Sequence, residues 1–224
     1  VPFIAKSTGL QIAKIAAKVM SGIKLNTLNL KNNYLISKHV SVKEVVFPFA
    51  RFPGCDILLG PEMKSTGEVM GIDSNFAKAF AKSQIAANNH LPKKGNVFIS
   101  VKNIDKPKIL EGCKLLVKIG FQIIATSGTH KFLAKYNINS IHLKKILEGR
   151  PNIIDFMLSG KIQVIINTIE NEATFKDSMI LRRNAVSQKI PYFTTIRSAL
   201  AFIEAVEILL SSELGIKPLQ KYHS

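Results

Sequence analysis

From residue 97 onward, short apolar segments alternate with longer segments of helical periodicity. The apolar segments are Val97–Val101, Phe121–Thr126, Ser140–Leu143, Gln163–Thr168 and Tyr192–Thr195. They are mostly continuous apolar runs, which is typical of strands that are covered on both faces. Helices are predicted near residues 105–118, 128–136, 151–159, 173–188 and 197–212. The pattern predicts an α/β fold, a parallel sheet with right-handed crossovers in a Rossmann-like three-layer sandwich.

Four of the predicted strands end in small side chains that can form hydrogen bonds. These side chains are Ser100, Thr126, Asn167–Thr168 and Thr194–Thr195. Because ligands bind beyond the carboxyl ends of parallel strands, the four ends are expected to form one polar rim that tolerates anions. Turns favour Ser, Thr and Asn in any protein, so ordinary capping is the alternative explanation.

The most informative strand end is Phe121–Thr129, FQIIATSGT, where a strand runs into hydroxyls and a glycine before a helix. The first N–H groups of a helix are unpaired and its dipole attracts negative charge. Gly128 lets a ligand approach the backbone closely. The stretch therefore indicates a phosphate pocket, although an ordinary N-cap has the same composition. Lys106 and Lys145 could supply positive charge, and each alone could equally be a solvated lysine.

The first part of the chain is less regular, and the polar linker Asn88–Asn96 separates it from the alternating part. Two helices are predicted there, one at 10–20 capped by Ser7 or Thr8 and one at 74–87 capped by Asp73 or Ser74. A strand at Val40–Phe49 and a short strand within 62–71 are predicted between them. The apolar, Ala-rich helix at 10–20 needs a neighbour that the chain does not contain. Glu44 lies inside an apolar strand, either facing solvent, in an ion pair, or aimed at a cationic ligand.

Composition narrows the possible functions. The net charge of +16 would suit a nucleic-acid surface, but the lysines are scattered and the chain has no Trp and no RNP-like aromatic motif. No run of about 20 apolar residues predicts a membrane span. The start at Val1 lacks the features of a signal peptide and suggests a chain that begins mid-protein. Cys55 and Cys113 are expected to be buried free thiols in the cytoplasm.

The usual catalytic motifs are missing from the sequence. It contains no GxGxxG, no GxxxxGK[ST] and no nucleophile elbow, and its histidines lack metal-ligand spacing. The final helix is expected to end at Gly215, with residues 217–224 as a ragged tail. The alternating part is therefore expected to be a binding module.

The chain resembles, nearly end to end, the C-terminal part of the large subunit of carbamoyl-phosphate synthases. The motifs that carry the resemblance are VPFIAKSTG, SVKEVVFPFARFPG, LLGPEMKSTGEVMG, FAKAFAKSQ, ATSGT, LEGRPNIIDFMLSGKIQVIINT, DSMILRRNAV and PYFTT. The resemblance implies that residues 1–92 end the second ATP-grasp unit, which phosphorylates carbamate. It implies that residues 93–224 form a methylglyoxal-synthase-like (MGS-like) allosteric domain. The family's metal and ATP ligands would lie before Val1.

The resemblance also implies the activity and partners of a parent enzyme. That ligase would make carbamoyl phosphate from glutamine-derived ammonia, bicarbonate and ATP, for pyrimidine and arginine biosynthesis in the cytoplasm. Its cofactors would be ATP and Mg²⁺ or Mn²⁺, with K⁺. Its partners would be the rest of the large subunit and a small glutamine amidotransferase subunit, with self-association through the allosteric domain. This chain alone would hold no catalytic or metal-binding residue and would be inactive.

Site residues follow from the resemblance position by position. The nucleotide effectors UMP (inhibitor) or IMP (activator) would be bound by Ser100, Lys106, Thr126, Thr129, Lys145 and Asn167. Ornithine would be bound by Glu44, Tyr192 and Thr194. The family's INTT motif departs here at Ile169, where an apolar side chain replaces a hydroxyl, so the identity of the effector stays open.

Two alternative functions remain at the sequence level. A stand-alone methylglyoxal-synthase-like lyase would share the sheet, but residues 170–173, ENEA, lack the glycine pair of that enzyme's loop. A basic nucleic-acid-binding module would explain the net charge.

Overall fold

The computed structural model describes residues 1–28, 30, 38–46, 67–169 and 172–223. The predicted end of the strand at 47–49, the turn around Cys55 and the loop at 170–171 lie outside the described residues. None of the helices in the described part is long and apolar enough to cross a membrane.

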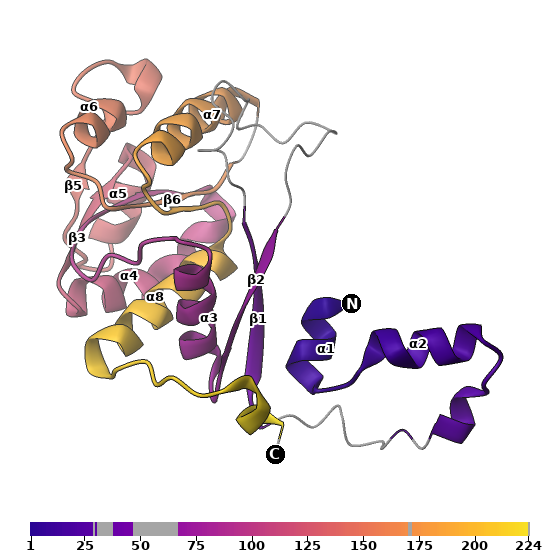
Figure 1. The fold of residues 1–224 in the computed structure, drawn as a ribbon. Helices are drawn as coiled ribbons and strands as arrows, with labels where there is room; N and C mark the ends of the chain where they lie inside the picture. The colour runs from indigo at the N-terminus through magenta and orange to yellow at the C-terminus, as the bar shows by residue number, and fades with distance from the viewer. Residues whose placement is uncertain (29, 31–37, 47–66, 170–171, 224) are drawn as a thin grey trace.

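A five-stranded parallel sheet forms the centre of the molecule (Figure 1), as the alternating pattern predicted. Its strands are β3 (Gly95–Ser100), β4 (Phe121–Ala125), β5 (Ile141–His142), β6 (Val164–Asn167) and β7 (Tyr192–Phe193). The order across the sheet is β5-β4-β3-β6-β7. The chain moves outward from β3 to β5 and then returns to the other side of β3. The carboxyl ends of β3 and β6 therefore flank the topological switch point, where ligands bind in sheets of this kind.

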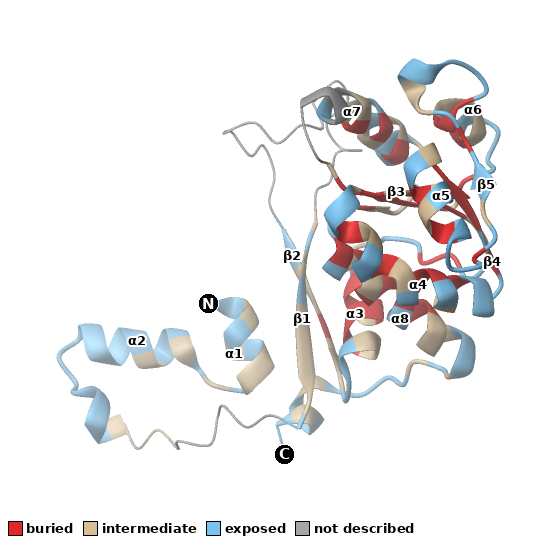
Figure 2. Ribbon diagram, turned by 180° about the vertical axis from the view of Figure 1, so that it is seen from behind, coloured by how far each residue is buried: buried red, intermediate tan, exposed pale blue. Residues whose placement is uncertain are grey.

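Helices cover both faces of this sheet, which confirms the three-layer arrangement. They are α4 (Lys106–Lys118), α5 (Ser127–Ala134), α6 (Ile153–Leu158), α7 (Glu172–Ser187) and α8 (Ile196–Ser211). Short 3-10 turns lie at η4 (Asn103–Asp105), η5 (Ile146–Glu148) and η6 (Leu219–Tyr222). Figure 2 shows the buried strands between these helices.

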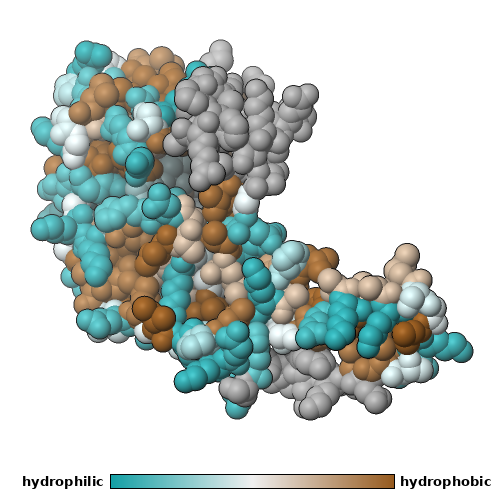
Figure 3. Space-filling model, viewed as in Figure 1, coloured by the Kyte–Doolittle hydropathy of each residue, from teal (hydrophilic) through white to brown (hydrophobic). Residues whose placement is uncertain are grey.

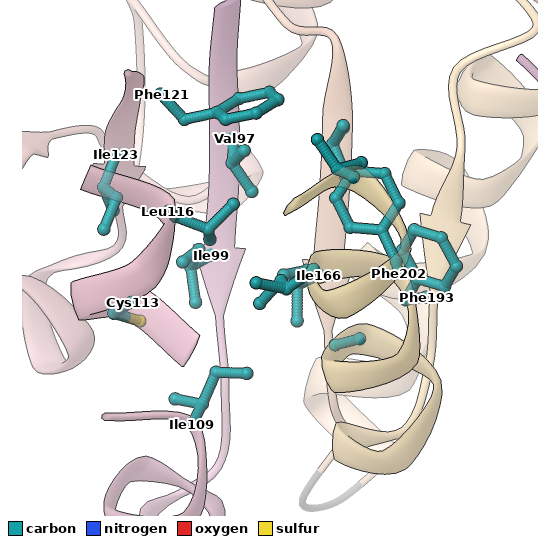
Figure 4. Packing of buried hydrophobic residues seen from close by; sticks show 14 of the residues in the cluster. Val97, Ile99, Ile109, Cys113, Leu116, Phe121, Ile123, Ile166, Phe193 and Phe202 are labelled. Atoms are coloured by element: carbon teal, nitrogen blue, oxygen red, sulfur yellow. The ribbon is translucent and has the colours of Figure 1, made fainter. Parts of the chain in front are cut away.

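Two apolar cores, one on each face, follow from the period-two alternation of β3. Val97 and Ile99 point into a core with α4 and α8, which is drawn in Figure 4. Phe98 points to the opposite face and packs with residues of α6 and α7. All three side chains are at most 1% exposed. Burying an apolar side chain of this size contributes about 1.5–3 kcal/mol, so the two-sided burial favours this register strongly.

The first part of the chain contains an antiparallel hairpin, β1 (Val40–Val45) with β2 (Glu68–Asp73), and the helix α3 (Phe76–Ala86). In Figure 1, α3 lies between this hairpin and α8. Phe80 and Ala81 of α3 belong to the same apolar core as β3 and α8. Packing therefore joins the hairpin unit to the sheet, and the domain boundary at residues 92–93 stays a prediction.

The N-terminal caps were predicted wrongly. Ser7 and Thr8 belong to an additional helix, α1 (Pro2–Thr8), which ends because Gly9 adopts a left-handed conformation with φ of 75°. The next helix, α2 (Ile12–Met20), has Gln11 at its N-cap, and a 3-10 turn, η1 (Leu25–Leu28), follows. Neither α1 nor α2 contains a buried residue. Residues 1–28, which contain α1, α2 and η1, are called the N-terminal arm. Exposed apolar side chains on this arm are visible in Figure 3, in agreement with the expected need for a neighbour.

The start of α3 also differs from the prediction. Asn75, rather than Asp73 or Ser74, caps α3, and its Oδ1 accepts a hydrogen bond from the Lys78 backbone N–H at 2.9 Å. Asp73 instead forms an ion pair with Lys82 at 2.6 Å. Asp73, at the end of β2, therefore pairs with a lysine of α3 that only the folded structure brings close to it.

The C-terminal region was mispredicted as well. Helix α8 ends at Ser211 rather than near Gly215. The segment expected to be a ragged tail folds back as η6 onto the first part of the chain. The Tyr222 hydroxyl donates to the Ile72 carbonyl at 3.3 Å, and His223 Nε2 donates to the Lys6 carbonyl at 2.9 Å. These partners lie 150 and 217 residues away, beyond the reach of local patterns.

Candidate effector site at the carboxyl ends of the sheet

Three hydroxyls gather where β3 and β4 end. Ile99 pairs with Ala125 across these parallel strands, so the residues that follow, Ser100 and Thr126, lie side by side. Thr126 Oγ1 donates a hydrogen bond to Ser100 Oγ at 3.3 Å. Thr129, one turn into the next helix, accepts a hydrogen bond from the Val101 backbone N–H at 3.4 Å. The structure therefore brings these three predicted residues together at one rim.

Asn167 reaches the same rim from the other side of β3. It pairs with Ser100 in the parallel register of β3 and β6, and it is 7% exposed. Its Nδ2 donates to the Tyr192 hydroxyl at 2.7 Å, and that hydroxyl also lies 2.9 Å from Ser178 Oγ. Asn167 is thus held in a fixed orientation by a hydrogen-bonded group inside the fold.

Lys106 places a positive charge beside the first turn of α5. Its Nζ lies 3.1 Å from the position that a Cβ on Gly128 would occupy. It also donates to Asn103 Oδ1 at 2.7 Å. The ammonium and the positive end of the α5 dipole therefore act on the same space, and both favour an anion. A side chain at position 128 would require the flexible end of Lys106 to shift by a few tenths of an ångström.

Lys145 lies in the segment before α6. It precedes η5, and its backbone N–H donates to Glu148 Oε2 at 2.9 Å. The Lys145 ammonium acts electrostatically on Asp177 of α7. Burial raises the pKa of Asp177, Lys145 opposes that rise, and Glu148 reinforces it. Among the described residues, no hydrogen bond or ion pair joins Lys145 to Ser100, Thr126 or Asn167.

Asp177 is a candidate that the sequence analysis missed. Its Oδ1 is buried and has no hydrogen-bond partner among the described residues. A buried carboxylate oxygen without a partner is costly, and a ligand hydroxyl would satisfy it. The sequence offers little signal for this role, because one carboxylate in a mixed polar helix looks like any solvated residue.

The residues expected to bind ornithine are placed in two different surroundings. Glu44, on β1, is half-buried and accepts a hydrogen bond from Gln84 Nε2 at 2.8 Å. Its pKa is raised by burial, and hydrogen bonds from Gln84 and from the Val45 backbone oppose that rise. Tyr192 contacts Asn167, as described above, and Thr194 is exposed. No hydrogen bond within the described residues joins Glu44 to Tyr192 or Thr194.

Taken together, the rim offers hydroxyls, an amide and an ammonium at the switch point, with a carboxylate and a second ammonium close to α7. Hydroxyl and ammonium donors at a helix N-terminus suit a phosphate. An amide and a carboxylate suit the hydroxyls of a sugar. Among the described residues, no three His, Cys, Asp or Glu side chains lie close enough together to hold a metal ion.

Comparison with known proteins gives the same result as the motifs. Residues 108–194 match the family described as MGS-like domain. The chain is 49% identical over 222 residues to the carbamoyl phosphate synthase large chain of Myxococcus xanthus, covering 99% of this chain and 20% of that protein. It is 47% identical over 226 residues to the large chain of Mesorhizobium japonicum (99% and 19%) and 46% identical over 223 residues to that of Methanothrix thermoacetophila (100% and 21%). The chain thus spans about a fifth of the length of these relatives. Residues 108–194 are thus similar to MGS-like domains, and the chain is similar over its whole length to one segment of the carbamoyl phosphate synthase large chain.

Proposed function

We propose that this chain is the C-terminal regulatory segment of a carbamoyl phosphate synthase large chain and binds a nucleotide monophosphate at the carboxyl ends of its sheet. The observation that carries the proposal is the meeting of Ser100 and Thr126 at the rim, with Lys106 set against the first turn of α5. Hydroxyls, a helix N-terminus and an ammonium together form a phosphate-binding arrangement. The lysine makes this more than an ordinary capped helix.

The proposal extends to the enzyme of which this chain would be a part. That enzyme would be a ligase that makes carbamoyl phosphate from bicarbonate, ATP and glutamine-derived ammonia in the cytoplasm. Its ATP and Mg²⁺ or Mn²⁺, with K⁺, would be bound outside this chain, and a small amidotransferase subunit would supply the ammonia. The apolar side chains of α1 and α2, among them Met20 at 88% exposure, would pack against the rest of the large subunit.

The choice between UMP and IMP depends on the sugar contacts. Ile169 offers no hydroxyl, and the Thr168 hydroxyl is held against the loop after β3, because its oxygen accepts a hydrogen bond from the Lys102 backbone N–H at 3.0 Å. The sugar of the nucleotide would therefore be held by Asn167 and by the buried Asp177 oxygen. Lys145, beside Asp177, would face the base or the sugar rather than the phosphate.

A second ligand, ornithine, belongs to the same proposal. Its side-chain ammonium would be received by the half-buried Glu44, because a carboxylate binds an ammonium strongly when both are partly desolvated. Tyr192 and Thr194 would complete that site. The hydrogen bond between Tyr192 and Asn167 would then connect the ornithine residues to the nucleotide residues.

Calorimetric titration of the 224-residue chain with UMP and with IMP tests the nucleotide site. We expect one of them to bind, and Lys106→Ala or Thr126→Ala to weaken its affinity at least about tenfold, through loss of charge-assisted hydrogen bonds. Lys131→Ala, which removes an exposed lysine on the same helix α5, is the control and should leave the affinity unchanged.

Absence of heat with both nucleotides, or equal affinities for Lys106→Ala and Lys131→Ala, would refute the nucleotide site. Phosphate release from dihydroxyacetone phosphate would instead support the lyase alternative. Strong RNA binding that weakens with salt would support the nucleic-acid alternative.

A further inference from the structure

At the C-terminal end of α3 the chain turns back toward Gln84. Asn88 takes a left-handed conformation with φ of 60°. Its backbone N–H donates to the Ile85 carbonyl at 3.0 Å, and the Asn89 N–H donates to the Gln84 carbonyl at 2.9 Å. These two bonds are those of a Schellman motif, in which the residue after the left-handed one closes back on the last turn of the helix. The motif therefore places Asn89 directly beside Gln84.

The side chains of Asn89 and Gln84 are then joined. Asn89 Nδ2 donates to Gln84 Oε1 at 2.9 Å. Because an amide oxygen only accepts hydrogen bonds, this contact holds the Gln84 oxygen on the side of Asn89. Its NH₂ group faces the other way and donates to Glu44 Oε2 at 2.8 Å. Gln84 is 5% exposed, so the amide is also held by the packing around it.

Backbone packing sets the distance between Glu44 and Gln84. The hairpin that carries Glu44 lies against α3 at Gly71, where a Cβ would overlap the Ala79 carbonyl and the Ser83 N–H. No side chain can therefore separate the hairpin from α3 at this point. Helix α3 in turn packs on α8 of the sheet. The position of the Glu44 carboxylate relative to the core is thus fixed through its hydrogen bond to Gln84.

We propose that Gln84, with its amide oriented by Asn89, is a positioning residue that holds the Glu44 carboxylate ready for the ammonium of a basic amino-acid effector. The proposal rests on the proposed role of Glu44 in binding ornithine. Gln84 does not contact the ligand. It donates a charge-assisted hydrogen bond that keeps a half-buried carboxylate in one orientation and favours its charged form.

The test compares three variants in the 224-residue chain. Gln84→Met keeps the length and volume of the side chain but removes the amide, and Asn89→Ala removes only the group that orients it. Gln122→Met makes the same exchange at an exposed glutamine of β4 and serves as the control. The measurements are the pKa of Glu44, from NMR of its labelled carboxyl group, and the affinities for L-ornithine and for L-norvaline, which lacks the side-chain ammonium.

We expect Gln84→Met to raise the Glu44 pKa further and to weaken ornithine binding about tenfold, with no change for norvaline. Asn89→Ala should change both quantities in the same direction but less, and the control should change neither. An unaltered Glu44 pKa in folded Gln84→Met would overturn the proposal. If the pKa responds as expected but the wild-type chain does not bind ornithine, the positioning role is supported and the proposed ornithine site is refuted.

Discussion

The hydroxyl side chains at the rim differ in the hydrogen bonds that they already make. The hydroxyls of Thr129 and Thr168 accept hydrogen bonds from the backbone N–H groups of Val101 and Lys102, so both hold the loop after β3. Ser100 and Thr126, in contrast, are hydrogen-bonded to each other. A pair of hydroxyls can exchange that bond for two bonds to a phosphate at little cost. Thr129 and Thr168 each keep an O–H that can still donate to a ligand, so their bonds to the backbone do not exclude them from the site, while Ser100 and Thr126 can turn both hydroxyls toward it.

Asp177 provides a residue-scale prediction about stability and pH. Burial raises its pKa in the folded state, so folding favours the protonated form. The folded state therefore loses stability as pH rises from the ordinary value of 3.8 through the raised pKa, and the loss persists at neutral pH. Asp177→Asn should therefore stabilise the ligand-free protein at pH 7.

Thermal unfolding of the wild type and Asp177→Asn between pH 3 and pH 8 checks this prediction. The difference in Tm should vanish in acid, where both side chains are neutral. Asp155→Asn is not a suitable control, because Asp155 Oδ2 accepts a hydrogen bond from the Asn152 backbone N–H. Glu207→Gln, at a partly exposed position of α8 whose carboxylate makes no ion pair among the described residues, serves instead. A Tm difference for Asp177→Asn that stays constant with pH would contradict the explanation.

Secondary-structure elements could be predicted well where local chemistry decides them. The strands after residue 95 are continuous apolar runs followed by helical periodicity, and their starts and ends agree with the structure within two or three residues. The wrong predictions concern segments whose conformation depends on residues far away in the sequence. Asp73 was assigned as a cap but is paired with Lys82, and η6 is held by carbonyls of β2 and α1.

The residues of the candidate site likewise divide into those set by local sequence and those set by long-range contacts. Ser100, Thr126 and Asn167 were found from the sequence because a strand end is a local feature and parallel strands bring such ends together. Asp177 and Gln84 were missed, because their roles depend on a buried oxygen without a partner and on a contact across 40 residues. Neither feature leaves a periodic trace in the sequence.

The contact between β2 and α3 gives a prediction for a whole element. A Cβ on Gly71 would overlap backbone atoms of Ala79 and Ser83, which cannot rotate away as a side chain would. Gly71→Ala should therefore push α3 away from the hairpin and destabilise the protein by about 3 kcal/mol. Chemical denaturation measures this change. Gly215→Ala, at a glycine with open space around it, should be nearly neutral. Equal stability of the two variants would show that α3 does not depend on this close approach.

At the scale of the whole molecule, the C-terminal segment contacts the N-terminal helix α1. The C-terminal turn η6 lies against the hairpin and α1 (Figure 1), although the N-terminal arm has no buried residue of its own. His39 and Tyr222 form an edge-to-face ring contact with centroids 5.6 Å apart, and His39 Nε2 donates to the Ser7 carbonyl at 2.8 Å. These contacts between the arm and the body are polar and aromatic, and several apolar side chains of the arm, among them Ile4, Val19 and Met20, stay exposed.

His223 is the group that connects the C-terminal turn directly to α1. Because the Lys6 carbonyl can only accept, Nε2 of His223 carries the hydrogen, and the ring packs on Gly9 with its Cγ 2.9 Å from where a Cβ would lie. His223→Ala should remove about 1 kcal/mol from the attachment and speed hydrogen exchange of the α1 amides about fivefold. Exchange in β4, deep in the sheet, should not change. His90→Ala, at an exposed histidine of the linker, is the matched control. If α1 exchanges at the same rate in both variants, the arm is held by other contacts and the C-terminal turn only rests on it.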